Sequence, residues 1–194
     1  MAKVTLLSIN DCFVLEGSRY KDERGFFTEL FNEVKHPEIH EKLKSCRQVS
    51  LSSSRAKVLR GIHTSQYSKL VSCLFGRLFD YVIDLRADST TYMTWLSVEL
   101  TPDNGKQLYV PPGCGHMFVS MENNTLMCYI QSGTFNPPFE MEVNAFDPSI
   151  GIILPGKDSY DACNVDYIIS EKDQNAPMLD EAQRLYNARH NVPE

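Results

Sequence analysis

The fold is decided by residues 58–86, which run VLRGIHTSQYSKLVSCLFGRLFDYVIDLR. Apolar runs rich in β-branched and aromatic residues are interrupted first by a polar segment and then by Gly76. Short apolar runs bounded by turn residues are typical of β-strands. We therefore predict three consecutive strands, over residues 58–63, 69–75 and 78–85.

The same pattern extends along the chain in both directions. Turn residues at 101–105 and 111–113 separate the later runs, and Asp103-Asn104-Gly105 is a good hairpin signal. Further strands are expected over residues 4–9, 12–15, 48–52, 95–100, 107–110, 116–120, 126–131 and 141–145. Many short strands with turns between them predict an all-β sandwich or barrel rather than βαβ units.

Two segments have helical character. Residues 32–43 are mildly helical and are interrupted by Pro37, whereas 179–189 carries acidic residues early and arginines late, as the helix dipole prefers.

With 194 residues, 42% hydrophobic content and a mean hydropathy of -0.29, the chain is expected to be one globular domain. We divide it into an N-terminal arm (about 1–50), a barrel (about 50–155) and a C-terminal helical segment (about 170–190).

Charge and cysteine usage limit the partners and the compartment. The net charge of -6 argues against nucleic acid as a partner, although local cations can still bind a small anion. The six cysteines form no CxxC motif, and Cys73 and Cys128 lie in apolar runs where free thiols pack as small hydrophobic groups. No signal peptide or membrane span is expected, so we predict a cytoplasmic protein without a membrane partner.

Reactive residues are concentrated in the first predicted turn. His63 lies between Arg60 and Lys69, three residues before it and six after it. A core strand does not require Arg, His and Lys together, whereas a site that binds an anion and moves a proton does; the alternative is a solvated loop. In a regular strand Arg60 and His63 point to opposite faces. Both can line one site only if the strand ends or bulges between them.

Three other segments carry residues that a barrel does not otherwise need. His116 follows a glycine-flanked turn, Tyr129 lies inside an apolar run, and Asp173 belongs to the charged segment 170–173. Two of them have a structural alternative: Tyr129 can be a core tyrosine with a satisfied hydroxyl, and 170–173 can be a solvated charge cluster.

Taken together, these segments resemble the dTDP-4-dehydrorhamnose 3,5-epimerase family over most of residues 20–180. The matching blocks are DERGFFTELF (22–31), VLRGIH (58–63), KLVSCLFGRLFDYVIDLR (69–86), LYVPPGCGHMFVS (108–120), the tyrosine run (126–131), FDPSIGIILP (146–155) and SEKDQNAP (170–177). The resemblance implies a cupin-like jelly-roll antiparallel barrel with short peripheral helices. It also implies a homodimer that exchanges sheet segments.

The resemblance implies catalytic roles for four residues. His63 matches the base, Asp173 the carboxylate that orients it, Tyr129 the acid on the opposite face, and Lys69 the cation beside the keto oxygen. Removing a proton next to a ketone suits a base of near-neutral pKa, and the enolate formed needs a positive group at its oxygen. This chemistry requires neither a cofactor nor a metal.

The resemblance also implies the substrate contacts. Arg60 and His116 match polar residues around the sugar and diphosphate, and Gln48 is assigned to substrate binding with them. Arg24 and Glu29 match an arm that contacts the nucleotide across the dimer. The expected substrate is a nucleotide-diphosphate 4-keto-6-deoxy sugar, inverted at carbon 3, carbon 5 or both.

Three departures from the family pattern leave the substrate open. The loop between His63 and Lys69 is several residues shorter than usual, and Phe135 replaces a second tyrosine. The segment 156–169 is longer than expected before the aspartate. The nucleotide can therefore be dTDP, GDP or CDP, and the choice between carbon 3 and carbon 5 is also open.

Other functions are compatible with a cupin-like fold. A metal-dependent cupin needs two or three histidines with a carboxylate, usually as an HxH pair, and none of the five histidines forms such a pair. His63 and His116 could still meet beside a carboxylate, whereas His36 and His40 fall in the expected helix. A non-catalytic sugar-binding cupin and a nucleotide-sugar 3,4-ketoisomerase are the remaining alternatives.

Overall fold

The computed structural model describes residues 3–190 apart from 33, 35–36, 44 and 161–165. His36, Cys163, part of the expected 32–43 helix and part of the segment 156–169 therefore lie outside the described residues. Within the described residues, no helix is long and apolar enough to cross a bilayer.

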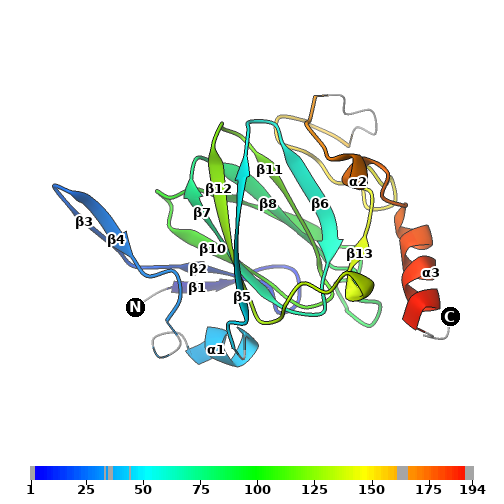
Figure 1. Ribbon diagram of the computed structural model, residues 1–194, viewed down its shortest axis with the longest axis horizontal. Coiled ribbons are helices and arrows are strands. Elements are labelled where there is room, and N and C mark those ends of the chain that lie inside the picture. Colours follow the sequence, from blue (N-terminus) through cyan, green and yellow to red (C-terminus); the bar gives the residue numbers. More distant parts are fainter. Residues whose placement is uncertain (1–2, 33, 35–36, 44, 161–165, 191–194) are drawn as a thin grey trace.

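The predicted apolar runs form strands, and these strands assemble into two facing antiparallel sheets (Figure 1). The six-stranded sheet has the order β1 (Lys3–Leu6), β2 (Phe13–Glu16), β10 (Lys106–Val110), β7 (Lys69–Phe75), β12 (Thr125–Gln131) and β5 (Gln48–Ser54). The five-stranded sheet has the order β13 (Met141–Glu142), β6 (Leu59–Thr64), β11 (Gly115–Ser120), β8 (Leu78–Ile83) and β9 (Trp95–Leu100). The prediction of an antiparallel all-β fold is confirmed.

The remaining elements are peripheral. A hairpin of β3 (Arg19–Asp22) and β4 (Gly25–Thr28) projects from the barrel (Figure 1). The helical elements are α1 (Pro37–Leu43), a 3-10 turn η1 (Pro137–Phe139), α2 (Glu171–Gln174) and α3 (Leu179–His190). Pro37 starts α1 instead of interrupting a longer helix, because proline is well suited to the first turn.

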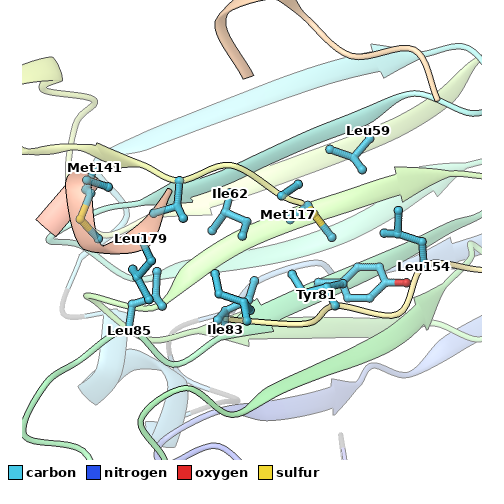
Figure 2. Packing of buried hydrophobic residues seen from close by; sticks show 14 of the residues in the cluster. Leu59, Ile62, Tyr81, Ile83, Leu85, Met117, Met141, Leu154 and Leu179 are labelled. Atoms are coloured by element: carbon cyan, nitrogen blue, oxygen red, sulfur yellow. The ribbon is translucent and has the colours of Figure 1, made fainter. Parts of the chain in front are cut away.

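The core consists of separate layers, each produced by side-chain alternation along the strands. Val71, Val82 and Phe118 belong to a buried cluster in which side chains of both sheets meet. A second cluster packs the outer face of the five-stranded sheet against the C-terminal segment and α3 (Figure 2). In β11, Met117 packs into this outer cluster, while Phe118 points inward. Both faces of β11 are therefore buried, and any polar side chain that faces the interior requires a partner.

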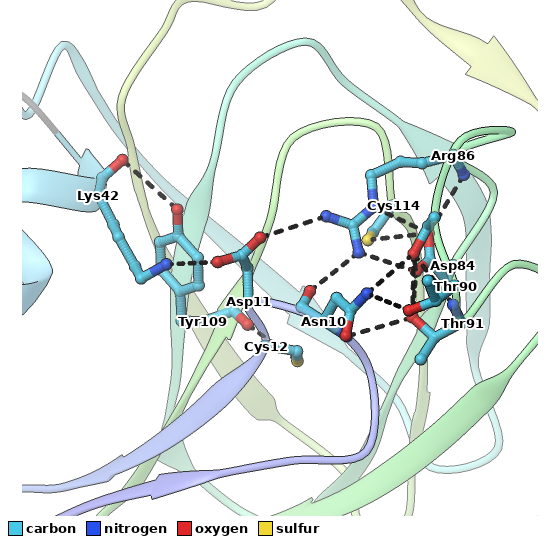
Figure 3. Close-up of polar contacts among 11 residues, drawn as sticks. Asn10, Asp11, Cys12, Lys42, Asp84, Arg86, Thr90, Thr91, Tyr109 and Cys114 are labelled. Carbon is cyan, nitrogen blue, oxygen red and sulfur yellow. Dashed lines mark hydrogen bonds and ion pairs between the residues drawn. The ribbon is translucent and has the colours of Figure 1, made fainter.

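A polar network at one end of the barrel joins segments distant in sequence (Figure 3). The buried Asp84 carboxylate accepts hydrogen bonds from Arg86, Ser89 and Thr91. Arg86 also donates to the main-chain oxygen of Asn10 at 2.9 Å. Burial alone would raise the pKa of Asp84, but these donors hold it far below its ordinary value. The network connects the β1–β2 turn to the β8–β9 connection.

Candidate functional site

A β-bulge in β6 places Arg60 and His63 on the same face. His63 pairs with His116 and Arg60 pairs with Phe118, so a three-residue step in β6 lies opposite a two-residue step in β11. The extra residue resets the alternation, as bulges do. Gly61 makes the bulge possible: its φ is +115°, and an added Cβ would lie 2.5 Å from the main-chain oxygen of His116.

A cavity of about 240 Å³ lies at this face. Six residues predicted for the site line it: Gln48, Arg60, His63, Lys69, His116 and Tyr129. Eight residues that were not predicted also line it: Ser50, Tyr67, Phe118, Gln131, Phe135, Glu140, Glu142 and Lys172. A larger groove of about 800 Å³ lies beside α3, but its arginine, Arg86, is already bound to Asp84. The smaller cavity therefore holds the predicted chemistry.

His63 and Asp173 form a hydrogen-bonded pair. His63 Nε2 lies 2.8 Å from Asp173 Oδ1, and Asp173 Oδ2 accepts the amide of Gly61 at 3.2 Å. Burial would raise the pKa of Asp173, but the bonds from His63, Gly61 and Ser170 hold it below its ordinary value. Asp173 is therefore ionised at neutral pH. Because Nε2 is bonded to Asp173, Nδ1 is the ring nitrogen of His63 that is free to accept a proton.

The start of α2 positions Asp173. The Ser170 hydroxyl accepts the Asp173 amide at 3.1 Å, a cap that fixes the first turn of this short helix. Asp173 is 6% exposed, whereas Glu171 and Lys172 are exposed. The solvated-cluster alternative is thus wrong for Asp173, and it describes only its neighbours.

Lys69 and Tyr129 reach the cavity from the six-stranded sheet, opposite His63. Lys69 is 8% exposed; burial lowers its pKa, and the carboxylates of Glu140 and Asp80 oppose that shift. Within the described part of the chain, its ammonium makes no hydrogen bond or ion pair. The Tyr129 hydroxyl lies 3.0 Å from Ser52 Oγ, and burial raises the pKa of Tyr129 to about 12. The site thus offers a cation and a protonated phenol across from an imidazole.

A second histidine–aspartate pair lies behind the cavity. His116 Nε2 is 2.7 Å from Asp80 Oδ1, and both side chains are buried. Asp80 Oδ2 has no hydrogen-bond partner among the described residues, and burial raises the pKa of this carboxyl despite the opposing effects of His116 and Lys69. Sequence analysis missed Asp80. An aspartate inside the apolar run LFDYVI could have marked this position as part of a site, because burying a carboxylate is costly unless it has partners.

The predicted binding residues fall into two groups. Arg60 is exposed at the cavity and donates to Ser54 Oγ and to the Ser53 carbonyl. The Gln48 side chain accepts a hydrogen bond from the main-chain amide of Phe135 at 3.0 Å. This bond anchors the segment of Phe135 at the cavity wall. These two residues therefore lie with His63, as expected.

Arg24 and Glu29 lie elsewhere in the same chain. Arg24 sits in the β3–β4 turn, where its guanidinium pairs with Asp22. Glu29 lines a separate cavity of about 170 Å³ together with Arg19 and Gln107. Neither residue lines the cavity that holds His63, so a single chain does not assemble the complete set of predicted substrate contacts.

Some of the residues missed by sequence analysis come from connections. Tyr67 lies in the β6–β7 connection, Glu140 follows η1, and Glu142 forms an ion pair with Lys172 at the cavity. No sequence motif marks these positions, because loop geometry brings them to the site. Within the described residues, no group of three or more His, Cys, Asp or Glu side chains could hold a metal ion.

Comparisons with known proteins point to one family. The sequence profile of the dTDP-4-dehydrorhamnose 3,5-epimerase family matches residues 6–181. The dTDP-4-dehydrorhamnose 3,5-epimerase of Salmonella typhimurium is 33% identical, covering 94% of this chain and 98% of the relative.

Solved structures are equally similar. A Legionella pneumophila dTDP-6-deoxy-D-glucose-3,5-epimerase in complex with dTDP-4-keto-L-rhamnose superposes with a TM-score of 0.83 at 29% identity, covering 93% of this chain and 94% of that one. A Streptomyces bikiniensis 3'-monoepimerase in complex with dTDP-quinovose superposes with a TM-score of 0.82 at 29% identity, covering 92% and 89%. The prediction of a cupin-like jelly-roll is confirmed by such neighbours.

Proposed function

Because this chain belongs to the dTDP-4-dehydrorhamnose 3,5-epimerase family, we propose that it inverts carbon 3, carbon 5 or both of a nucleotide-linked 4-keto-6-deoxy sugar. The protein is an isomerase. The observation that supports the mechanism is the placement of His63 and Tyr129 on opposite sheets, both lining one cavity with Lys69. Inversion needs a base on one face of the sugar and an acid on the other.

The first step is removal of the proton next to the ketone. His63 Nδ1 takes this proton as the C–H bond breaks, and the electron pair moves to the keto oxygen to form an enolate. Asp173 stabilises the resulting imidazolium and holds the ring in one tautomer. The Lys69 ammonium stabilises the enolate oxygen, and its burial strengthens this interaction because little water screens it.

The second step is protonation from the opposite face. The Tyr129 hydroxyl donates its proton to carbon as the enolate returns to a ketone. Burial raises the pKa of Tyr129 to about 12, so the hydroxyl is protonated before the reaction. Solvent then restores the proton to Tyr129 and removes one from His63, which closes the cycle without a cofactor.

We assign the diphosphate and nucleotide to the polar residues around this centre. Arg60 is an exposed cation at the cavity and suits an anionic diphosphate. Gln48 and His116 complete the contacts to the sugar side of the substrate. Arg24 and Glu29 act from a partner subunit, since they lie away from the cavity of their own chain.

The exposed apolar surface supports a homodimer. Val49 and Leu51 on the edge strand β5 are 63% and 60% exposed, and Tyr20 and Phe27 on the projecting β3–β4 hairpin are 59% and 63% exposed (Figure 1). An open edge strand with apolar side chains is a ready site for pairing with another chain. Sedimentation should show a dimer at micromolar concentration, and a monomer would contradict this assignment.

We also assign the protein to the cytoplasm. The described cysteines are free thiols, and Cys12, Cys73, Cys114 and Cys128 are buried. Burial raises the pKa of the Cys114 thiol to about 12, so that thiol resists oxidation. Reducing compartments keep such thiols unpaired.

One experiment tests the class of reaction and the substrate together. The protein is given dTDP-, GDP- and CDP-linked 4-keto-6-deoxy sugars in deuterated water, and proton NMR identifies which carbon exchanges and which inverts. Exchange with inversion at carbon 3 or 5 is the expected result. Migration of the carbonyl would instead identify a 3,4-ketoisomerase. Absence of exchange with all three sugars would contradict the proposal for these substrates.

A further inference from the structure

Ser52 on β5 contacts the tyrosine that is assigned as the acid. Its Oγ lies 3.0 Å from the Tyr129 hydroxyl, and either oxygen can be the donor. Among the described residues, the Tyr129 hydroxyl has no other hydrogen-bond partner. Ser52 itself does not line the cavity that holds His63. The serine can therefore influence a substrate in this cavity only through Tyr129.

The strand geometry produces this contact. Positions 50, 52 and 54 of β5 are all serines, and alternate residues of a strand share one face of the sheet. Across the β5–β12 pair, Ser50 lies opposite Tyr129 and Ser52 lies opposite Met127. Tyr129 therefore meets Ser52 on the diagonal, a separation that an aromatic side chain can span.

The two other serines of this row have different partners. Ser50 Oγ donates to Gln131 Oε1 at 3.2 Å. Ser54 Oγ accepts a hydrogen bond from Arg60 Nε at 3.3 Å. Neither of these serines bonds to Tyr129, so they do not duplicate the contact made from position 52.

The charge of Tyr129 changes during the proposed second step. When its hydroxyl donates a proton to carbon, a phenolate is left between the two sheets. Burial opposes that charge and raises the pKa of Tyr129 to about 12, while the hydrogen bond with Ser52 acts in the opposite direction. A hydrogen bond to a charged group contributes more than one to a neutral group. A donor at this position therefore stabilises the transition state more than the starting complex.

The direction of the hydrogen bond also decides where the Tyr129 proton lies. If Ser52 accepts, this proton lies between the two oxygens and is held by a residue outside the cavity. If Ser52 donates, the Tyr129 proton is free to point into the cavity. Only the second arrangement suits proton transfer to a bound sugar.

We propose that Ser52 is a positioning residue whose hydroxyl donates to the Tyr129 oxygen, leaves the Tyr129 proton free for the substrate and stabilises the phenolate formed when that proton moves to carbon. Ser52 keeps its own proton throughout, and solvent restores the proton to Tyr129. The role of Tyr129 as the acid rests on the proposed function.

Kinetics test the effect on the second step. Ser52→Ala removes the hydroxyl, and we expect kcat for inverted product to fall about 10-fold with little change in KM. Deuterium wash-in should stay close to that of wild type, because His63 removes the proton before Tyr129 acts. Ser52→Thr keeps a hydroxyl and should restore inversion. Equal losses of wash-in and inversion in Ser52→Ala, or unchanged inversion, would overturn the proposal.

A double-mutant cycle tests whether the effect acts through Tyr129. In a Tyr129→Phe background, Ser52→Ala should cause no further loss of inverted product, because no hydroxyl remains for the serine to bond. A further loss of about 10-fold in that background would overturn the proposal.

A neighbouring serine provides the matched control. Ser53 is the next residue of β5, and its side chain is exposed on the opposite face of the strand. Ser53→Ala keeps the main-chain oxygen that accepts a hydrogen bond from Arg60. This variant should leave inversion unchanged. A loss equal to that of Ser52→Ala would assign the effect to the strand as a whole and would overturn the proposal.

A measurement without substrate separates this proposal from the proposed function. A fluorinated tyrosine at position 129 has a lower phenol pKa than tyrosine, and 19F NMR can follow its ionisation. We expect Ser52→Ala to raise this pKa, because the phenolate loses its donor. An unchanged pKa would overturn the proposal. If the wild-type protein inverts none of the sugars, the proposed function fails, while this titration still decides whether Ser52 stabilises the phenolate.

Discussion

Substituting Asp173 by Asn tests the catalytic pair most directly. The carboxylate has two different partners: Oδ1 faces His63 Nε2 at 2.8 Å, and Oδ2 accepts the Gly61 amide at 3.2 Å. An asparagine can satisfy only one of them correctly. If its NH2 group faces Gly61, two donors meet. If its NH2 group faces His63, Nε2 must accept and the proton moves to Nδ1, which can then no longer act as the base.

The expected loss follows from the charge that is removed. Two unit charges about 4 Å apart interact by about 4 kcal/mol at an effective dielectric of about 20. At about 1.4 kcal/mol per factor of ten, this corresponds to about 10³-fold in rate. The His63 side chain is 36% exposed, so solvent screens part of the interaction. We therefore expect Asp173→Asn to slow deuterium exchange at the α-carbon by about 10²- to 10³-fold, less than the loss of His63 itself.

The assay is deuterium wash-in from heavy water, followed by proton NMR on the substrate established as active. Asp147→Asn is the matched control: Asp147 is also a buried carboxylate with a lowered pKa, but its partners are the Leu179 amide and Ser149, outside the cavity. It should reduce thermal stability and leave exchange unchanged. Wild-type exchange in a folded Asp173→Asn protein would refute the assigned role of the pair.

The remaining predictions concern the base, the acid, the bulge and acid stability. His63→Asn should abolish exchange at the α-carbon, and normal exchange would contradict its role as the base. Tyr129→Phe should retain part of the deuterium wash-in while inverted product falls sharply, because His63 can return the proton to the same face; unchanged inversion would identify a structural tyrosine. Gly61→Ala should lower both the melting temperature and the activity. The added Cβ would collide with the His116 carbonyl, and the φ of +115° at this position costs about 1–3 kcal/mol for residues other than glycine. A melting temperature equal to that of wild type would be inconsistent with this. Because the pKa of Asp84 is depressed in the folded state, its stabilisation is complete above the unfolded value near 3.8 and is lost as pH falls through the folded value. The difference in urea stability between wild type and Asp84→Asn should therefore begin to shrink below about pH 4 and should keep shrinking as the pH falls further; a difference that stays constant below about pH 4 would contradict this.

The sequence alone determined the strands and the types of reactive group. Strand positions follow from local alternation and turn residues, which explains why β7, β9 and β12 begin and end within about one residue of their predicted bounds. The resemblance to the epimerase family likewise predicted that His63 and Tyr129 belong to one site, and both line the cavity. The β3–β4 hairpin was not among the predicted strands.

Only the tertiary structure decided how these groups meet. Asp173 lies 110 residues from His63, and their contact depends on the cap at Ser170 and on the Gly61 bulge, which local patterns do not encode. Asp80 gains its significance from His116, which the chain supplies on another strand. Pairing energies of this kind depend on distance in space and on burial, whereas strand propensity depends on neighbours in sequence. The sequence therefore predicted which chemistry is present, and the packing of the two sheets determined which atoms carry it.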